Sequence, residues 1–280
     1  MQNPTNHSAK LILHPTDFSS ESEIAFDHAL RIAIHNKATL YLLHVLDQAD
    51  EPENWDAFPQ VRQTLERWGL LGPGSKQHEV IGKLGVEIHK VSSRSSDVVN
   101  TILTFPQVND VDLIVLGTHG REGWHRWLHP SIAEPVARAS HIPTLFVPCQ
   151  SSGFVSRESG QVRLREVLIP IDHHPDLQPA LERATNIVNA LGGSDSTITI
   201  FHAGKDMPTV TIPNGSLGRW RMVLRDGRAA HEIAKVAEEL DPDLITMVTA
   251  GHQGFLDALR GSTTEQIVRK SSSPLLAIPA

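Results

Sequence analysis

The chain has 280 residues, about twice the length of a common single domain, so its length predicts two domains. Hydrophobic residues make up 40% of the chain and charged residues 20%, which is typical of a folded globular protein and excludes a disordered one. The formal charge of −7 and the lack of a basic run argue against a nucleic-acid partner. The chain also lacks an apolar run of ~20 residues, which argues against a membrane partner, so we expect a cytoplasmic protein.

Short apolar runs alternate with amphipathic stretches along the first half of the chain. The first run, residues 10–17, ends in Asp17, and the second, residues 39–45, ends at Val45. An amphipathic segment of roughly residues 53–81 follows, and further apolar runs lie at residues 112–120 and 142–148. Alternating strands and helices predict a parallel sheet that is covered on both faces.

The second half repeats this pattern in the same order. Its apolar runs cover residues 166–172, 197–203, 243–251 and 273–279. Four matched runs indicate an internal repeat. The second half has no counterpart of the amphipathic segment at residues 53–81. We expect residues 205–218 to form an extended loop that leaves one sheet face thinly covered, and we expect the first domain or a second chain to cover that face.

These patterns predict the fold class and the domain boundaries. We expect two doubly wound three-layer α/β/α domains of Rossmann-like type, each with a five-stranded parallel sheet. The first domain is predicted at residues 1–150 and the second at residues 165–280, where it is shorter and lacks the second helix. Residues 151–164 are rich in Ser and Gly and are predicted to be a linker.

Residues that follow the strands are the candidates for ligand binding, because open α/β sheets bind ligands outside the carboxyl ends of their strands. After the fourth strand, each half has a glycine-containing loop and then a helix, an arrangement that can bind phosphate through backbone N–H groups. Hydroxyl groups of Ser131, Ser262 and Thr263 can donate to the same anion. Asp17 and Asp172 have an alternative role, together with Ser19, Ser20 and Asp176, in capping the first helix of each half.

The repeated strand-and-loop pattern resembles the universal stress protein family over nearly the whole chain, twice. Nucleotide-binding members of that family carry Gly-x2-Gly-x9-Gly-Ser/Thr after the fourth strand and Asp after the first. The resemblance implies an adenine nucleotide α-hydrolase-like fold and binding of ATP or another adenine nucleotide, with or without Mg²⁺. The residues that it implicates are Asp17, Val45, Gly117, Gly120 and Ser131 in the first half and Asp172, Ala203, Gly251, Gly261, Ser262 and Thr263 in the second.

Neither half matches the family motif completely. In the first half, Pro130 occupies the position of the third glycine and has no N–H to give a phosphate. In the second half, Val248 occupies the position of the first glycine, and its side chain can crowd the ribose while the phosphate end of the motif stays intact. The second half is therefore the better candidate site.

Three functions from different classes fit the sequence. The first is a non-catalytic stress-response protein that binds nucleotide and a protein partner, because no well-placed general base accompanies the glycine loops. The second is a nucleotide-free interaction module, in which the two halves form an internal pseudo-dimer or the chain forms a homodimer. The family resemblance implies that the strands ending near Pro148 and Pro279 make the contact between domains. The third is a metal-assisted hydrolase, although the 16 histidines show no recognised ligand spacing, which argues against a bound transition metal.

Overall fold

The computed structural model describes residues 10–20, 22–46, 52–118, 132, 136, 141–149, 151, 153–174, 176–249 and 273–279. The chain divides into two compact units, Ala9–Gln161 and Val162–Ala280. Within the described ranges, no helix has both the length and the apolar character needed to cross a membrane.

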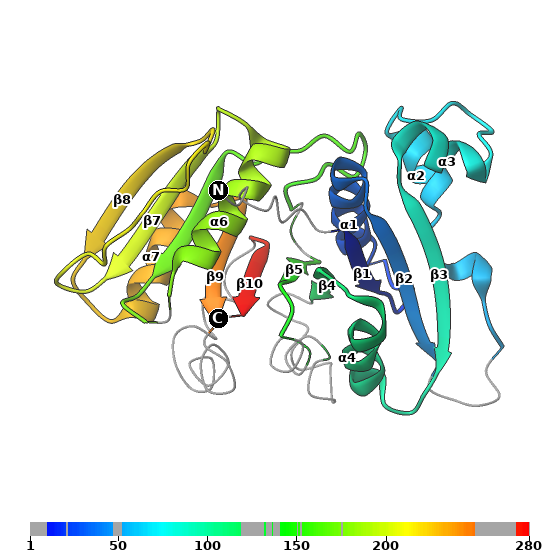
Figure 1. Ribbon diagram of the computed structural model, residues 1–280, viewed down its shortest axis with the longest axis horizontal. Coiled ribbons are helices and arrows are strands. Elements are labelled where there is room, and N and C mark those ends of the chain that lie inside the picture. Colours follow the sequence, from blue (N-terminus) through cyan, green and yellow to red (C-terminus); the bar gives the residue numbers. More distant parts are fainter. Residues whose placement is uncertain are drawn as a thin grey trace, which may run out of the picture. The chain divides into compact units, whose positions relative to one another are not determined.

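The first unit is a parallel sheet with the strand order β3-β2-β1-β4-β5 (Figure 1). Its strands are β1 (Leu11–Pro15), β2 (Thr39–Leu46), β3 (Glu87–Arg94), β4 (Leu113–Thr118) and β5 (Thr144–Pro148). Its helices are α1 (Ser22–Asn36), the 3₁₀ turn η1 (Trp55–Ala57), α2 (Val61–Arg67), α3 (Gln77–Leu84) and α4 (Val98–Asn109). The chain moves outward from β1 to β3 and then returns to the other side of β1, so the strand order reverses between β1 and β4.

Helices α1 and α4 cover opposite faces of this sheet. The Tyr41 ring on β2 contacts the Phe105 ring of α4, with 5.2 Å between the ring centres. The His14 ring on β1 is 6.2 Å from the Phe26 ring of α1. His14 is in register with Leu42, the residue after Tyr41, and successive residues of a strand point to opposite faces. The first unit therefore has three layers.

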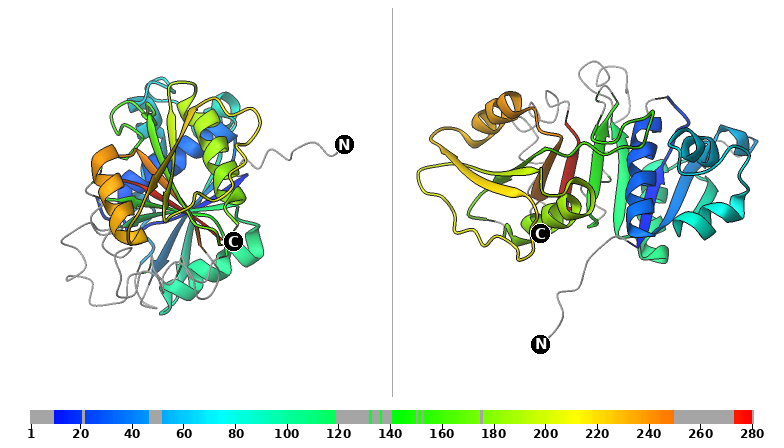
Figure 2. Two further views of the ribbon diagram at one scale, coloured as in Figure 1. Left: turned by 90° about the vertical axis from the view of Figure 1, so that its left-hand side faces the viewer. Right: turned by 90° about the horizontal axis from the view of Figure 1, so that it is seen from above.

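The second unit has the corresponding strand order β10-β9-β6-β7-β8, again all parallel. Its strands are β6 (Glu166–Ile171), β7 (Thr197–Ala203), β8 (Arg219–Arg225), β9 (Leu244–Thr249) and β10 (Leu275–Pro279). Its helices are α6 (Gln178–Ile187), which continues into the π-helical turn η3 (Val188–Gly192), and α7 (Ala229–Leu240). Figure 2 shows α6 and α7 on opposite faces of the sheet, so the predicted fold class is confirmed.

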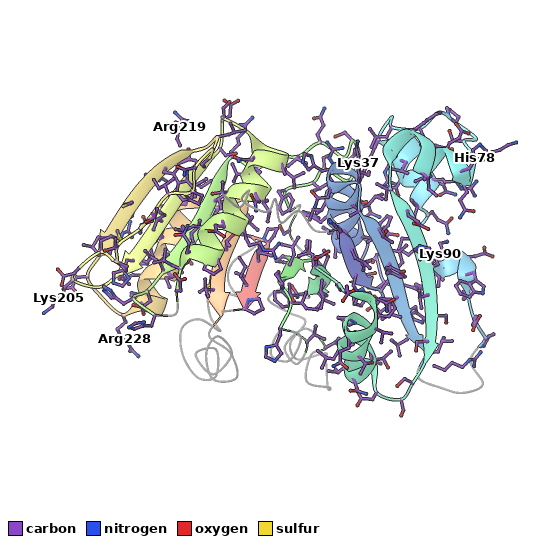
Figure 3. All side chains as sticks on the ribbon, viewed as in Figure 1. Lys37, His78, Lys90, Lys205, Arg219 and Arg228 are labelled. Atoms are coloured by element: carbon purple, nitrogen blue, oxygen red, sulfur yellow. The ribbon has the colours of Figure 1, made fainter. Side chains whose placement is uncertain are left out.

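The crossover from β7 to β8, residues 204–218, contains no helix. In the first unit, the equivalent crossover from β2 to β3 contains α2 and α3. In Figure 3, Arg219 lies at the start of β8, and Lys205 lies near the start of the helix-free crossover. The two units therefore differ most at their outer strands.

In each unit, an aspartate carboxylate accepts hydrogen bonds from the backbone at the amino end of a neighbouring central strand. The carboxylate of Asp112, directly before β4, accepts hydrogen bonds from the backbone N–H groups of residues 10–11 at 2.8 and 2.9 Å. The carboxylate of Asp243, directly before β9, accepts from those of residues 165–166 at 2.6 and 3.0 Å. Repetition of this contact shows that the two sheets are built alike in detail as well as in strand order.

Replacement of Asp243 by alanine is expected to lower the free energy of unfolding by about 2–3 kcal/mol, because two backbone donors lose a charged acceptor. Asp243→Asn is the matched control, since its amide oxygen can still accept, and we expect less than half of that loss. Urea denaturation of the intact chain measures both values. Equal losses in the two variants would show that the charge of the carboxylate, and not the hydrogen bonds as such, stabilises the fold.

Residues 153–161, which the sequence predicts to be part of a linker, pack on the first unit and are called the strap below. Phe154 and Val155 are 1% and 2% exposed. The backbone N–H of Phe154 donates to Nε2 of His28 on α1 at 3.0 Å, and the two rings meet edge to face at 4.5 Å between centres. The strap is therefore part of the first unit, because it carries apolar side chains and α1 offers them a surface.

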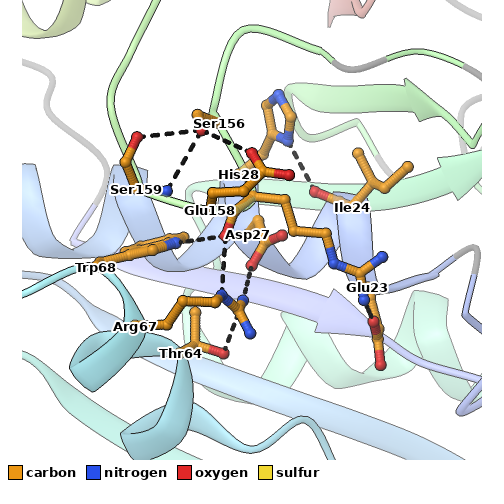
Figure 4. Close-up of polar contacts among 11 residues, drawn as sticks. Glu23, Ile24, Asp27, His28, Thr64, Arg67, Trp68, Ser156, Glu158 and Ser159 are labelled. Atoms are coloured by element: carbon orange, nitrogen blue, oxygen red, sulfur yellow. Dashed lines mark hydrogen bonds and ion pairs between the residues drawn. The ribbon is translucent and has the colours of Figure 1, made fainter.

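The strap also contacts α2 (Figure 4). The backbone carbonyl of Arg157 accepts hydrogen bonds from Nε of Arg67 at 2.9 Å and from the indole N–H of Trp68 at 3.0 Å. Gly160 has a φ of +65°, and a Cβ atom at that position would lie 2.4 Å from the Trp68 ring. Only glycine fits there without displacing the indole. Gly160 therefore determines the direction of the backbone at the end of the strap.

Candidate functional site

The carboxyl edge of the first sheet brings together the predicted site residues that the structure describes there. Asp17 follows β1, Val45 lies near the end of β2, and Gly117 lies in β4 on the other side of β1. The Nδ1–H group of His44 donates to the backbone carbonyl of Thr16 at 2.8 Å, which ties the ends of β1 and β2 together. These residues therefore flank the point where the strand order reverses.

Strands β1 and β4 separate from each other at this point, while each stays paired with its other neighbour. The pairing of β1 with β4 covers Ile12 and Leu13, near the amino ends of the strands. Beyond them, Nδ1–H of His14 donates to the backbone carbonyl of Val115 at 2.9 Å. Burial lowers the pKa of His14 to about 4, so this ring is neutral at pH 7. Sequence analysis did not single out His14, because a buried histidine inside an apolar run gives no distinct signal.

Asp17 helps to begin α1. Its carboxylate accepts from the backbone N–H of Ser19 at 3.0 Å and from the Ser19 hydroxyl at 2.6 Å. Burial acts to raise the pKa of Asp17, but hydrogen bonds from Ser19 and Ser22 outweigh it and lower the pKa below its ordinary value. Ser19 Oγ in turn accepts from the backbone N–H of Ser22, the first residue of α1, at 3.2 Å. The capping role is thus shared between Asp17 and Ser19.

Aromatic rings cover the end of β2 in the first unit. The Phe18 ring stacks on the His44 ring with 3.8 Å between centres, and Phe58 meets Phe18 edge on at 4.9 Å. Phe58 is 2% exposed, Trp55 stacks on it at 5.5 Å, and the Lys90 ammonium lies 5.6 Å from its ring centre. This cluster fills the space beside His44 with the protein's own side chains.

The equivalent edge of the second unit has no phenylalanine cluster among the described residues, although His202 itself is buried at 4% exposure. Asp172 is exposed after β6, and its carboxylate accepts from the backbone N–H of His173 at 2.7 Å. Nδ1–H of His202 donates to the backbone carbonyl of Ile171 at 2.9 Å, beside Ala203 at the end of β7. His173 occupies the position of Phe18 but is exposed, and its ring meets His202 edge on at 5.2 Å. Among the described residues of this unit, no phenylalanine ring contacts His202.

Other predicted residues take a structural role or fall outside the described ranges. The Asp176 carboxylate accepts from the backbone N–H of Gln178, the first residue of α6, at 3.0 Å, and so binds a free donor of the first turn from the position before the N-cap residue Leu177. Val248 lies in β9, in register with Ile278. The remaining predicted positions lie outside the described residues: Gly120, Pro130, Ser131, Gly251, Gly261, Ser262 and Thr263.

The histidines at the strand ends bind backbone carbonyls through Nδ1. His44 and His202 do so at equivalent positions of the two units. Across the described part of the chain, no group of three or more His, Cys, Asp or Glu side chains is placed to hold a metal ion. The geometry gives these two histidines a structural role in both units.

A doubly wound parallel sheet with polar residues gathered where its strand order reverses defines a class of ligand-binding α/β proteins. Within that class, the sequence model of the universal stress protein family matches residues 9–148 and 214–279. The chain therefore belongs to this family. The family predicted from the sequence is therefore confirmed.

Individual relatives support the same assignment. A universal stress protein of Methanocaldococcus jannaschii is 31% identical over 143 residues, which cover 49% of this chain and 81% of the relative. A universal stress protein A homolog of Coxiella burnetii is 26% identical over 119 residues, or 42% of this chain and 83% of the relative. The solved structure of a universal stress protein from Archaeoglobus fulgidus aligns over 99% of both chains, with a TM-score of 0.63 and 18% identity, and shows the shared fold.

Proposed function

We propose that this stress-response protein binds ATP or a related adenine nucleotide at the carboxyl edge of the second unit and acts in the cytoplasm without being an enzyme. Asp172 and the backbone at Ala203 would contact the adenine. The loop with Gly251, Gly261, Ser262 and Thr263 would contact the ribose and phosphates.

The observation that carries this proposal is the difference between the two sheet edges. In the first unit, Phe18 and Phe58 cover His44, so a flat base would have to displace packed rings. In the second unit, the residue corresponding to Phe18 is the exposed His173, and no described phenylalanine ring contacts His202, which is 4% exposed. Asp17 and Asp172 are both exposed, so the carboxylates do not distinguish the two edges. A base that enters the second edge would displace one exposed imidazole, whereas a base that enters the first edge would displace stacked phenylalanine rings, so the second edge suits a nucleotide base better.

The same edge supports a binding role more than a catalytic one. Nδ1 of His202 is occupied by a backbone carbonyl, and the side chain is 4% exposed. A general base needs to be within hydrogen-bond reach of the proton that it removes, which a buried, backbone-bound imidazole does not offer. We therefore expect nucleotide occupancy to be the functional output, with any hydrolysis incidental.

Titration calorimetry of the intact chain with ATP and Mg²⁺ tests the proposal. We expect saturable binding that Asp172→Ala weakens by about tenfold or more, because a base-facing carboxylate is lost. The matched control is Asp17→Ala, at the equivalent position of the covered edge, and it should leave the affinity unchanged. A second variant, Gly261→Pro, removes a backbone donor from the phosphate loop and should also weaken binding.

The outcomes separate the two units. Loss of binding in Asp17→Ala alone would place the nucleotide in the first unit and refute our assignment. No binding by the unaltered chain would refute the proposal and favour the nucleotide-free interaction module, for which the exposed apolar residues of β8 give a specific reason.

A further inference from the structure

Strand β8 carries an exposed apolar strip that the fold does not require. Met222 is 49% exposed and Leu224 is 44% exposed, and both lie on the same face of the strand as Trp220. In the crossover before β8, Leu217 and Ile212 are 54% and 40% exposed. On β3, at the corresponding position in the first unit, no large hydrophobic side chain is exposed.

The edge of β8 is also free for pairing within the second unit. β8 is last in the order β10-β9-β6-β7-β8, and its described strand pairing is with β7 alone. A free edge next to exposed apolar side chains is the usual setting for pairing with a strand of another chain. Helix α2 belongs to the crossover before β3 in the first unit, whereas the crossover before β8 has no helix to cover such a strip.

The sequence of β8 is complementary to itself. In an antiparallel pair centred on Met222, Met222 would face its own copy and Trp220 would face Leu224 of the partner. All three apolar pairs would then lie on one face, as an isologous two-fold contact requires. Such aromatic and aliphatic cross-strand pairs stabilise a sheet.

Two of the three arginines of β8 have partners inside the unit, whereas the first, Arg219, would face Arg225 of the other copy. Arg221 donates to Glu166 at 2.9 Å and to the Thr199 hydroxyl at 2.7 Å. Arg225 makes two hydrogen bonds to the Glu239 carboxylate at 2.9 and 2.5 Å. The charges of Arg221 and Arg225 are therefore balanced inside the unit, which reduces the repulsion between copies. The same balance disfavours an acidic peptide, because it would have to displace those glutamates.

We propose that two copies of this chain associate through their β8 strands, antiparallel and centred on Met222, which places the apolar strips of both copies side by side on one face of the joined sheet. The contact joins the two β7–β8 edges into one continuous sheet. It is independent of nucleotide binding, since it uses the edge of the sheet and not the carboxyl ends of the strands.

Analytical ultracentrifugation of the full chain over a range of concentrations tests the association. We expect a monomer–dimer equilibrium whose dissociation constant rises at least tenfold in Met222→Glu, because two carboxylates would face each other. Val108→Glu is the matched control: Val108 is 82% exposed on α4 in the first unit, so its replacement should not change the equilibrium. Circular dichroism verifies that both variants are folded.

Disulfide cross-linking tests the register in a Cys149→Ser background, which removes the one natural cysteine. Met222→Cys should form a covalent dimer on oxidation, whereas Leu217→Cys should not, because an antiparallel register centred on residue 222 separates the two copies of residue 217 by roughly 34 Å. A chain that stays monomeric would overturn the proposal. If the thiol introduced by Met222→Cys were then protected from thiol reagents in the monomer, the first unit would be the element that covers the strip. A dimer that tolerates Met222→Glu, or that cross-links at residue 217, would also overturn it.

Discussion

Replacement of Phe154 by alanine is expected to lower the free energy of unfolding of the first unit by about 3–4 kcal/mol, since truncating a buried phenylalanine removes its apolar contacts and leaves a cavity. Phe154 is 1% exposed and meets the His28 ring edge to face. Its backbone N–H donates to the same ring, so a shifted strap would also leave Nε2 of His28 without a donor. The effect would be large because one residue connects the strap to the centre of α1.

Hydrogen exchange of the intact chain, read by mass spectrometry, shows which unit responds. Peptides from α1 and α2 should lose protection in Phe154→Ala, while peptides from β6 and β7 should keep it. The control is Arg157→Ala, which keeps the backbone carbonyl that Arg67 and Trp68 bind and removes an exposed ion pair with Glu23, so its effect should stay below about 1 kcal/mol. Unchanged protection of α1 in Phe154→Ala would mean that the strap is a linker.

The central strands of both sheets could be predicted from the sequence because their signal is local and repeated. Leu13 and Leu168, for example, are fully buried residues in apolar runs that end in aspartate in both halves. Strands buried on both faces have no polar alternation to obscure them. The same runs placed Asp17 and Asp172 at the carboxyl edge, where the structure has them.

The strap and the ring cluster were not predicted because their environment depends on contacts distant in sequence. Phe154 lies among Ser and Gly residues, which favours a linker until α1 is seen to offer it a surface. Phe18 follows Asp17 directly, yet nothing local shows that Phe58, 40 residues later, will pack on it. Such contacts are set by tertiary packing, which sequence patterns do not encode.

Acidification is expected to destabilise the first unit through two buried histidines. Burial lowers the pKa of His14 and of His28 from 6.5 to about 4 in the folded state. Below pH 6.5 the unfolded chain therefore binds protons that the folded chain does not, and stability is lost as the pH falls towards 4. Linkage gives a loss of about 3 kcal/mol for each histidine over this range.

Asp27 acts in the opposite direction. It is 2% exposed on α1, and burial raises its pKa from 3.8 to about 7, although Arg67 lies 3.8 Å away and lowers it, while Glu158 raises it further. A carboxyl group with a raised pKa favours folding while it is protonated, so its contribution is present at low pH and is lost as the pH rises through 7. Between pH 6.5 and 4, protonation of Asp27 therefore offsets about 3 kcal/mol of the loss from the histidines.

Asp27→Asn separates the two effects. The variant should be more stable than the unaltered chain at pH 8, because it has no buried charge there, and it should lose roughly twice as much stability between pH 6.5 and 4, because the offset is gone. Urea denaturation of both proteins at matched pH values measures the difference, in which all other titrating groups cancel. Parallel curves would show that Asp27 does not titrate in this range, whereas a variant that is less stable at pH 8 would show that the Arg67 ion pair outweighs burial.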